Sequence, residues 1–281
     1  SGDVGRYADR ILPFPALPPQ ADVVICESTY GDREHAAMQD AEEALWYQVH
    51  HTCVEKKGKL IIPAFSVGKT QEVLYTLNEL SNAGRLPRIP VYVDSPLGIE
   101  ATKVVKAHSD LFSEKVRAEL ANDPDLFSFL GVEYVKNSER SKQLNDTQEP
   151  CIVISASGMM EAGRIRHHLR HALDNPRNTI LAVGFCAPGT LGDRILRGDE
   201  RVFIFGQPVE VKAEVVKIGF YSAHADRNEL VRFLKSQDPA NVEHLFLVHG
   251  VEQVQERLRE KLLAEGFRNV AIPAQGTRVE L

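Results

Sequence analysis

The sequence predicts an α/β protein with a mainly parallel sheet flanked by helices. Apolar runs rich in Val, Ile and Leu recur along the chain and alternate with segments of helical periodicity. The 281 residues are 43% hydrophobic and 26% charged, which is the balance of an ordinary globular protein. A chain of this length can bury a sizeable core. Because no apolar stretch approaches the ~20 residues that a membrane helix needs, a membrane-spanning protein is excluded.

Strand and helix alternate through the first two thirds of the chain. The helix expected over residues 67–83 places Val73, Leu77 and Leu80 on one face, and Gly84 ends it. Strands separated by helices in this way favour parallel pairing through crossover connections. The expected elements are strand 23–26, helix 33–57, strand 59–64, helix 67–83, strand 91–93, helical stretches across 97–121, strands 132–135 and 151–155, helix 161–173 and strand 179–184.

The pattern changes after Asp199. Two strands in close succession, 202–205 and 209–217, interrupt the alternation. The end of the chain then returns to helix 226–236, strand 245–248, helix 251–265 and strand 269–272. Two α/β layers joined through the chain are therefore expected, rather than one uniform sheet.

Charge and cysteine content exclude several classes of protein. The net charge of −6 excludes a globally basic nucleic-acid binder, so any contact with nucleic acid has to be a local patch. The cysteines are far apart and form no Cys-x-x-Cys pair, which excludes a zinc ribbon or a disulfide framework. We expect core thiols in a reducing compartment, the cytoplasm. They are Cys26, Cys53, Cys151 and Cys186.

Two segments offer weaker signals. Gly68-Lys69-Thr70 resembles the end of a phosphate-binding loop, but Pro63 stands where that motif needs its first glycine, so we do not expect a nucleotide triphosphatase. His167 and His171 share a helix face and could chelate a metal, although no carboxylate or cysteine completes a site within that helix. A basic face, either solvated or touching phosphates, is the better interpretation.

The strongest local signals are polar residues that end apolar strands. Glu27 follows one strand, His224 lies in Tyr-Ser-Ala-His-Ala-Asp and His249 in Phe-Leu-Val-His-Gly. Carboxylate and imidazole groups at strand ends suit metal binding and acid–base catalysis. The turn 155–158, rich in small and hydroxyl residues, follows another strand and is a candidate anion site, with a simple tight turn as the alternative.

These residues resemble the β-CASP group of metallo-β-lactamase-fold nucleases, and the resemblance covers essentially the whole chain. Asp3 matches the bridging aspartate of the family, Glu27 its motif A, His224 its motif B and His249 its motif C. The segments between them also follow the family's order: PAFSVGKTQEVLY (63–75), DSPLGIEAT (94–102), SASGMMEAGR (155–164) and GFCAPGTLG (184–192).

At motif C the chain has a histidine, His249, and in this it resembles the RNA-processing branch of the family. The chain resembles the pre-mRNA 3′-end cleavage nuclease and its prokaryotic relatives more than ribonuclease J. Val251 departs from the glutamate that is common after the His-Gly pair. The family's His-x-His-x-Asp-His run is absent, so we expect the C-terminal part of a longer nuclease. The resemblance implies a β-CASP domain at 32–219 and a partial metallo-β-lactamase αββα domain formed by 1–31 and 220–281.

The resemblance also implies a mechanism. Two zinc ions in the intact enzyme would activate a water molecule, with Asp3 bridging them and His249 binding one. His224 would be the general acid, oriented by Glu27. The β-CASP domain would cap the metals and leave a cleft for single-stranded RNA. Ser157 and Gly158 would contact phosphate, and Arg164 would assist electrostatically.

Alternatives remain at this point. The family also contains catalytically inactive RNA-binding or scaffold subunits, and a small-molecule metallohydrolase of the same superfamily is a third interpretation. The four matched motif residues favour the enzyme. The long insertion between Glu27 and His224 disfavours the small-molecule metallohydrolase. Because the chain contains only half of the metal ligands, we expect it by itself to bind zinc poorly and to have little nuclease activity. We also expect it to self-associate, for example as a homodimer.

Overall fold

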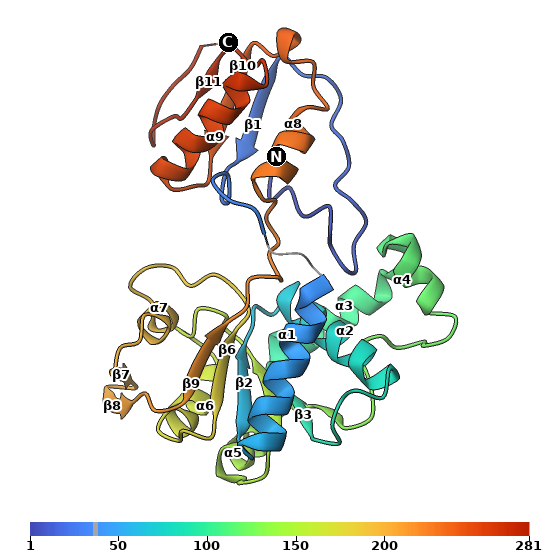
Figure 1. The fold of residues 1–281 in the computed structure, drawn as a ribbon, viewed down its shortest axis with the longest axis vertical. Helices are drawn as coiled ribbons and strands as arrows, with labels where there is room; N and C mark the ends of the chain where they lie inside the picture. The colour runs from blue at the N-terminus through green and yellow to red at the C-terminus, as the bar shows by residue number, and fades with distance from the viewer. Residues whose placement is uncertain (36–38, 281) are drawn as a thin grey trace. The chain divides into compact units, whose positions relative to one another are not determined.

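The chain forms two compact units. The computed structural model describes residues 1–35 and 39–280. One unit comprises Ser1–Ala36 and Ser222–Leu281, and the other comprises Ala37–Tyr221. We call them the smaller and the larger unit, and Figure 1 shows the elements of each. The assignment of residues 1–31, 32–219 and 220–281 to two family domains stays a prediction.

The smaller unit is built on three parallel strands. β1 (Val23–Glu27) pairs with β10 (His244–Val248), and β10 pairs with β11 (Val270–Ala271). The helices α8 (Arg227–Leu234) and α9 (Glu252–Ala264) supply the apolar residues that complete the core. Leu230 and Leu234 pack there with Leu247 and Leu258. The register sets Glu27 opposite Val248, so the carboxyl ends of β1 and β10 coincide.

The larger unit is built on six parallel strands in the order β4-β3-β5-β2-β6-β9. The expected parallel sheet flanked by helices is confirmed. An antiparallel hairpin of β7 and β8 adds a second, small sheet. The strands are β2 (Lys59–Pro63), β3 (Val91–Val93), β4 (Val132–Tyr134), β5 (Cys151–Ser155), β6 (Thr179–Ala182), β7 (Arg201–Ile204), β8 (Gln207–Glu210) and β9 (Glu214–Lys217).

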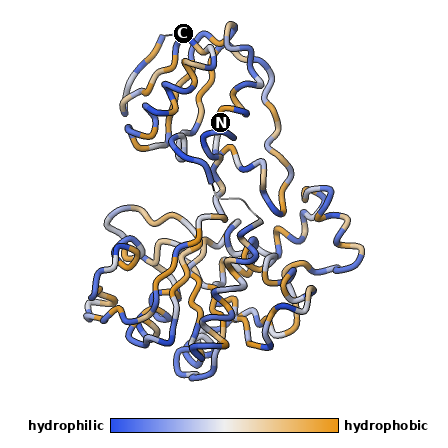
Figure 2. Tube along the Cα trace, in the orientation of Figure 1, coloured by the Kyte–Doolittle hydropathy of each residue, from blue (hydrophilic) through white to orange (hydrophobic). Residues whose placement is uncertain are grey.

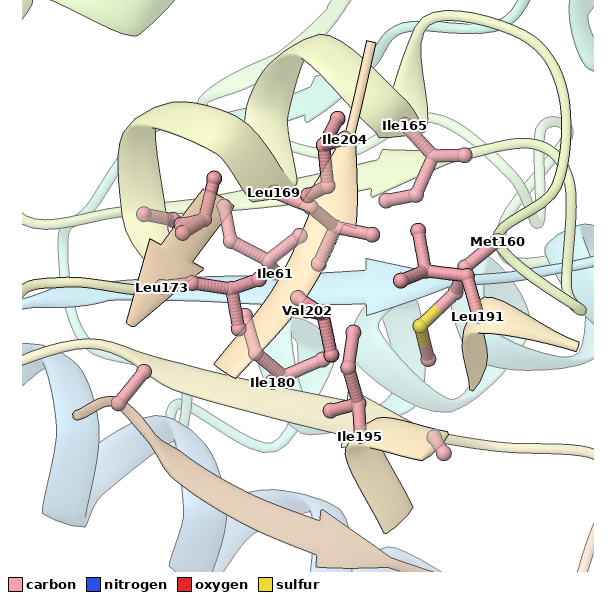
Figure 3. Packing of buried hydrophobic residues seen from close by; sticks show 14 of the residues in the cluster. Ile61, Met160, Ile165, Leu169, Leu173, Ile180, Leu191, Ile195, Val202 and Ile204 are labelled. Atoms are coloured by element: carbon pink, nitrogen blue, oxygen red, sulfur yellow. The ribbon is translucent and has the colours of Figure 1, made fainter. Parts of the chain in front are cut away.

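Helices cover this sheet and seal its core. Figure 3 shows how Ile61 of β2 and Ile180 of β6 pack against Leu169 and against Val202 of β7. The helices are α1 (Gln39–Val49), α2 (Lys69–Asn82), α3 (Pro96–Ala107), α4 (Glu114–Glu119), α5 (Ser138–Asp146), α6 (Ile165–Ala172) and α7 (Leu191–Leu196). Figure 2 shows the strands as mostly hydrophobic and the outer segments as mostly hydrophilic.

The expected elements differ from the structure at several points. The strand expected over 209–217 is two strands, β8 and β9, which belong to different sheets. The helix expected over 33–57 begins at Gln39 and changes to a π-helical turn at His50–Glu55, while residues 33–35 are not helical. Residues 36–38 of that prediction lie outside the described residues. The helices α5 and α7 were not expected. Only Ser141 and Leu144 of α5 are buried, so this helix carries almost no apolar periodicity that sequence analysis could detect.

Two of the exclusions can be compared with the structure. All four cysteines are free and buried, which confirms the core thiols. Burial raises the pKa of Cys53 to about 12, so this thiol stays protonated and unreactive at neutral pH. In the described parts of the chain, no helix is both long and apolar enough to cross a membrane.

Candidate active site

Parallel pairing of β1 and β10 brings two of the candidate residues together. Glu27 is the last residue of β1, and His249 follows the last residue of β10 directly. Since Glu27 and Val248 are register partners, the two side chains emerge at the same edge of the sheet. The strand-end motifs Glu-Ser-Thr-Tyr and Val-His-Gly therefore meet in space although they are more than two hundred residues apart in sequence.

The turn after β10 holds His249 in an unusual backbone conformation. Its φ of 53° lies in the left-handed region, which residues other than glycine rarely occupy. The Thr29 hydroxyl lies 3.1 Å from the His249 carbonyl oxygen. A Cβ on the next residue, Gly250, would come within 2.6 Å of Ser28 Oγ, so only glycine fits there. The His-Gly pair thus packs tightly against the loop that follows β1.

A serine and a capping box position His224. The Ser222 hydroxyl accepts a hydrogen bond from the His224 backbone N–H, at 3.1 Å. Two residues later, Asp226 caps α8, because its carboxylate accepts from the Glu229 N–H while the Glu229 carboxylate accepts from the Asp226 N–H. The Ser-Ala-His-Ala-Asp motif is therefore the rigid entry to a helix, and it fixes where the imidazole emerges.

Glu27 and His224 form a tight pair. Glu27 Oε2 lies 2.7 Å from His224 Nδ1; the Glu27 side chain is 2% exposed and that of His224 is 22% exposed. Burial pushes the pKa of Glu27 up, but hydrogen bonds from His224, Thr29 and the Val4 N–H outweigh burial and hold it below its ordinary value. Glu27 is therefore a carboxylate at neutral pH, and the His224 ring reaches the surface.

Thr29 connects both histidines to Glu27. Its hydroxyl lies 2.7 Å from Glu27 Oε2, 3.1 Å from His249 Nδ1 and 3.3 Å from His224 Nδ1. A carboxylate can only accept, so the single hydroxyl proton goes to Glu27 in this shortest contact. His249 Nδ1 then has to carry a proton and donate it to Thr29, which leaves His249 Nε2 with a free lone pair. The same reasoning puts a proton on His224 Nδ1, facing Glu27.

Asp3, His224 and His249 form a group that could hold a metal ion. Each offers one ligand atom, and these atoms lie within 4.8 Å of one another. A carboxylate oxygen and imidazole nitrogens are ligands that zinc accepts. The lone pair on His249 Nε2 and the exposed Asp3 carboxylate suit metal binding, whereas His224 already directs Nδ1 toward Glu27. The donor set on these residues therefore fits zinc.

The larger unit has a hollow of about 790 Å³ that contains two of the other candidates. Its walls come from residues 65–67 after β2, 95–97 after β3, and 156, 157 and 162–164 after β5. Ser157 and Arg164 line it. Gly158 is buried instead, because its Cα faces the Phe65 ring so closely that a Cβ would come within 2.7 Å of it.

Comparison with known proteins identifies the family of the chain. Residues 70–195 match the Beta-Casp domain, and residues 208–273 match the Zn-dependent metallo-hydrolase RNA specificity domain. The chain belongs to the β-CASP family. Its relatives are nucleases and RNA-processing factors, which places it in the RNA-processing branch of that family.

The β-CASP relatives include bacterial, archaeal and eukaryotic proteins. Ribonuclease TTHA0252 of Thermus thermophilus is 38% identical over 266 residues, which are 95% of this chain and 58% of the relative. Transcription termination factor FttA of Methanosarcina mazei is 32% identical over 84% of this chain and 38% of its own length. Cleavage and polyadenylation specificity factor 73 of Drosophila melanogaster is 30% identical over 94% of this chain and 38% of its own length. The chain thus spans about 40 to 60% of the length of these relatives.

A buried ion cluster that the sequence analysis missed lies beside the hollow of the larger unit. Asp94, at the end of β3, is fully buried and contacts Arg164 Nη1 and His168 Nε2, each at 2.6 Å. The Ser141 hydroxyl donates to the same carboxylate at 2.5 Å. Asp94 stands in the Asp-Ser-Pro-Leu segment, where a carboxylate after an apolar strand was the same kind of signal as Glu27. Arg164 therefore has its charge balanced inside the protein.

The weaker candidates lie elsewhere. The His167 ring lies against Phe205, tilted by 36°, with ring centroids 4.6 Å apart. Within residues 1–35 and 39–280 the histidines of α6 belong to no metal-capable group. Lys69 is buried at the start of α2. The residue that sequence reasoning overlooked in the metal-capable region is Thr29, which the Glu-Ser-Thr-Tyr motif contained but to which no role was given.

Proposed function

We propose that the protein is a zinc-dependent ribonuclease that hydrolyses phosphodiester bonds of single-stranded RNA in RNA processing or decay. The observation that carries this proposal is the convergence of Asp3, His224 and His249 around Thr29, with Glu27 buried behind them. The names of the relatives, among them a ribonuclease and an endoribonuclease, support the same activity. The proposed cleavage is internal, and 5′-to-3′ exonuclease action is part of the same proposal.

Asp3 and His249 would hold the metal. His249 presents Nε2 because Nδ1 donates to Thr29, and Asp3 is exposed, so its carboxylate can reach a solvent-facing ion. When bound, two zinc ions would supply an activated water and would stabilise negative charge on the attacked phosphate. Because the sequence contains no His-x-His-x-Asp-His run, we expect residues 1–281 by themselves to bind two zinc ions weakly and to cleave RNA slowly.

His224 would act as the general acid. The Glu27 carboxylate accepts from Nδ1 and stabilises the protonated imidazole, so Nε2 is left to deliver a proton to the leaving oxygen of the RNA. Glu27 can do this because its own pKa is held low and it stays charged. The 22% exposure of the His224 side chain gives the ring access to a substrate at the surface.

The loop 155–164 of the β-CASP domain would contact the RNA. Ser157 lines the hollow, Gly158 lets Phe65 approach the loop, and the ion pair of Arg164 with Asp94 fixes the end of the loop. Because phosphate contacts release counterions, RNA binding should weaken as the salt concentration rises. We propose a cytoplasmic location, and self-association as a homodimer is part of the same proposal.

The test is single-turnover cleavage of a single-stranded RNA by the intact nuclease with substitutions of His224 and Asp3. His224→Ala should lower the rate about 10²- to 10⁴-fold and leave zinc content unchanged, because it removes the acid and not a ligand. Asp3→Ala should remove both zinc and activity, as measured by elemental analysis. His244→Ala is the matched control, since this half-buried histidine lies at the other end of β10.

Two results would contradict the proposal. A His224→Ala rate within about threefold of the unsubstituted enzyme would exclude the acid role. If the unsubstituted protein bound RNA but held no zinc and cleaved nothing, it would be an RNA-binding or scaffold subunit instead.

A further inference from the structure

The hollow in the larger unit has apolar walls that face solvent. Phe65 is 38% exposed, Val67 68% and Leu97 66%. Phe65 and Val67 lie in the turn that follows β2, and Leu97 lies in the first turn of α3, which follows β3. These are the carboxyl ends of parallel strands, where α/β sheets usually bind ligands. The volume of about 790 Å³ lies in the range of small-molecule pockets. The hollow is therefore large enough for a flat ring with a substituent.

Its charge disfavours a phosphate group as the occupant. Among the lining residues that the structure describes, Arg164 alone is charged, and its guanidinium already binds the Asp94 carboxylate. It also donates to the backbone carbonyls of Val135 and Lys136, at 2.9 and 3.0 Å. A guanidinium neutralised in this way offers little attraction to an anion. The hollow therefore suits an uncharged group.

The shape of the wall favours an aromatic occupant. The Cδ2–Cε2 edge of the Phe65 ring rests against Gly158, and the same edge also faces Gly184. Those glycines hold the ring in place from one side, so its exposed part faces the hollow. Ser66, Ser95 and Ser157 line the same space. Ser95 Oγ accepts from the Gly98 N–H and Ser157 Oγ from the Ala162 N–H, so both hydroxyls keep a proton that they can donate. A fixed aromatic surface beside hydroxyl groups is the arrangement that binds nucleobases by stacking and by hydrogen bonds at their edges.

We propose that this hollow is a subsite for one nucleobase of a single-stranded RNA, stacked on Phe65 with its edge against the serine hydroxyls. The proposal deepens the function proposed above and rests on it for the identity of the ligand. The subsite would hold one nucleotide of the substrate by its base, independently of the metal-binding residues of the smaller unit. Recognition by stacking tolerates different bases, so the preference among the four should be modest.

Binding of a fluorescein-labelled ten-nucleotide RNA to the intact protein, with a chelator present so that no cleavage occurs, tests the aromatic wall. Phe65→Leu keeps an apolar side chain beside Gly158 but removes the aromatic face, and it should weaken binding about 5- to 100-fold. Phe65→Tyr should bind like the unsubstituted protein. Phe203→Leu is the matched control, because Phe203 is an exposed phenylalanine on β7, outside the hollow. Equal binding by Phe65→Leu and Phe203→Leu would overturn the proposal.

A second measurement separates this proposal from the nuclease activity. Phe65→Trp places an indole in the wall, and Trp46, the single native tryptophan, sets the background. Adenosine 5′-monophosphate, titrated to about 10 mM, should quench the new fluorescence, and ribose 5-phosphate should not. The base subsite would be overturned if ribose 5-phosphate quenched the fluorescence to the same extent, or if neither compound quenched it. Quenching by the nucleotide in an intact protein that cleaves no RNA would retain the subsite and reject the proposed nuclease.

Discussion

The two units each contain a carboxylate–imidazole pair at the end of a parallel strand, and the pairs differ in exposure. Glu27 and His224 lie 2.7 Å apart in the smaller unit, and Asp94 and His168 lie 2.6 Å apart in the larger one. The His224 side chain is 22% exposed, whereas that of His168 is 2% exposed. The two pairs contain the same chemical groups but differ in what they can do, because only a ring that reaches the surface can exchange a proton with a substrate.

The partners of the two carboxylates explain the difference. Glu27 is contacted by Thr29 and His224, both within reach of the metal-capable group. Asp94 is contacted by Ser141 of α5, by His168 of α6 and by Arg164, the residue that precedes α6. Its ion pairs therefore connect secondary-structure elements. We interpret the first pair as catalytic and the second as structural, and the two can be separated by substitution.

Removing the Asp94 charge should have the largest effect on stability. Asp94→Asn leaves the Arg164 guanidinium without its buried counter-charge, and breaking such a pair costs about 3–5 kcal/mol. Urea unfolding followed by Trp46 fluorescence measures this, since Trp46 lies on α1 of the same unit. Glu139→Gln, at an exposed ion pair, is the control and should change stability by less than about 0.5 kcal/mol. A loss below about 1 kcal/mol for Asp94→Asn would contradict the structural role.

The same substitution predicts a pH dependence. Burial raises the pKa of Asp94, but hydrogen bonds from His168, Ser141 and Arg164 lower it more, so its pKa in the folded protein lies below the ordinary value. A carboxyl with a depressed pKa stabilises the fold fully above its unfolded pKa, about 3.9, and loses that contribution as the pH falls through the folded pKa. The stability gap between the unsubstituted protein and Asp94→Asn should be constant near neutral pH and should narrow below about pH 4. A gap that widens in acid would contradict this assignment.

Glu27→Gln should affect RNA cleavage more than stability, whereas Asp94→Asn should mainly affect stability. The amide keeps the size of the side chain but cannot stabilise a protonated His224, so single-turnover RNA cleavage should fall about 10- to 100-fold. Zinc content should not change, because Glu27 lies behind the metal-capable group and is not part of it. The loss of unfolding free energy should be smaller than for Asp94→Asn. An unchanged cleavage rate with a large loss of stability would make Glu27 a structural residue like Asp94.

The sequence predicted the Glu27 side of this comparison better than the Asp94 side. Apolar strands that end in Glu27 and His249 predict a common sheet edge, because parallel strands align their carboxyl ends. Neither strand indicates that Thr29 would bond to three side chains, since that depends on packing between distant segments. Arg164 was expected, from the family resemblance, to assist phosphate binding electrostatically. Its neutralisation depends on Asp94, seventy residues earlier in the chain, and local sequence patterns carry no information about that contact.

Thr29→Val should produce the smallest effect, and it tests whether Thr29 links Glu27 to the metal-capable group. Valine has the shape of threonine without the hydroxyl, so Glu27 loses one donor and His249 loses the acceptor that fixes its Nδ1 proton. One hydrogen bond of this kind contributes about 1 kcal/mol, which corresponds to roughly a fivefold loss of zinc affinity or cleavage rate. Thr29→Ser should restore both, because it returns the hydroxyl. Zinc titration of both variants measures the effect. If valine and serine variants bound zinc equally well, the tautomer of His249 would be set by something other than Thr29, and the link between Glu27 and the metal-capable group would be lost.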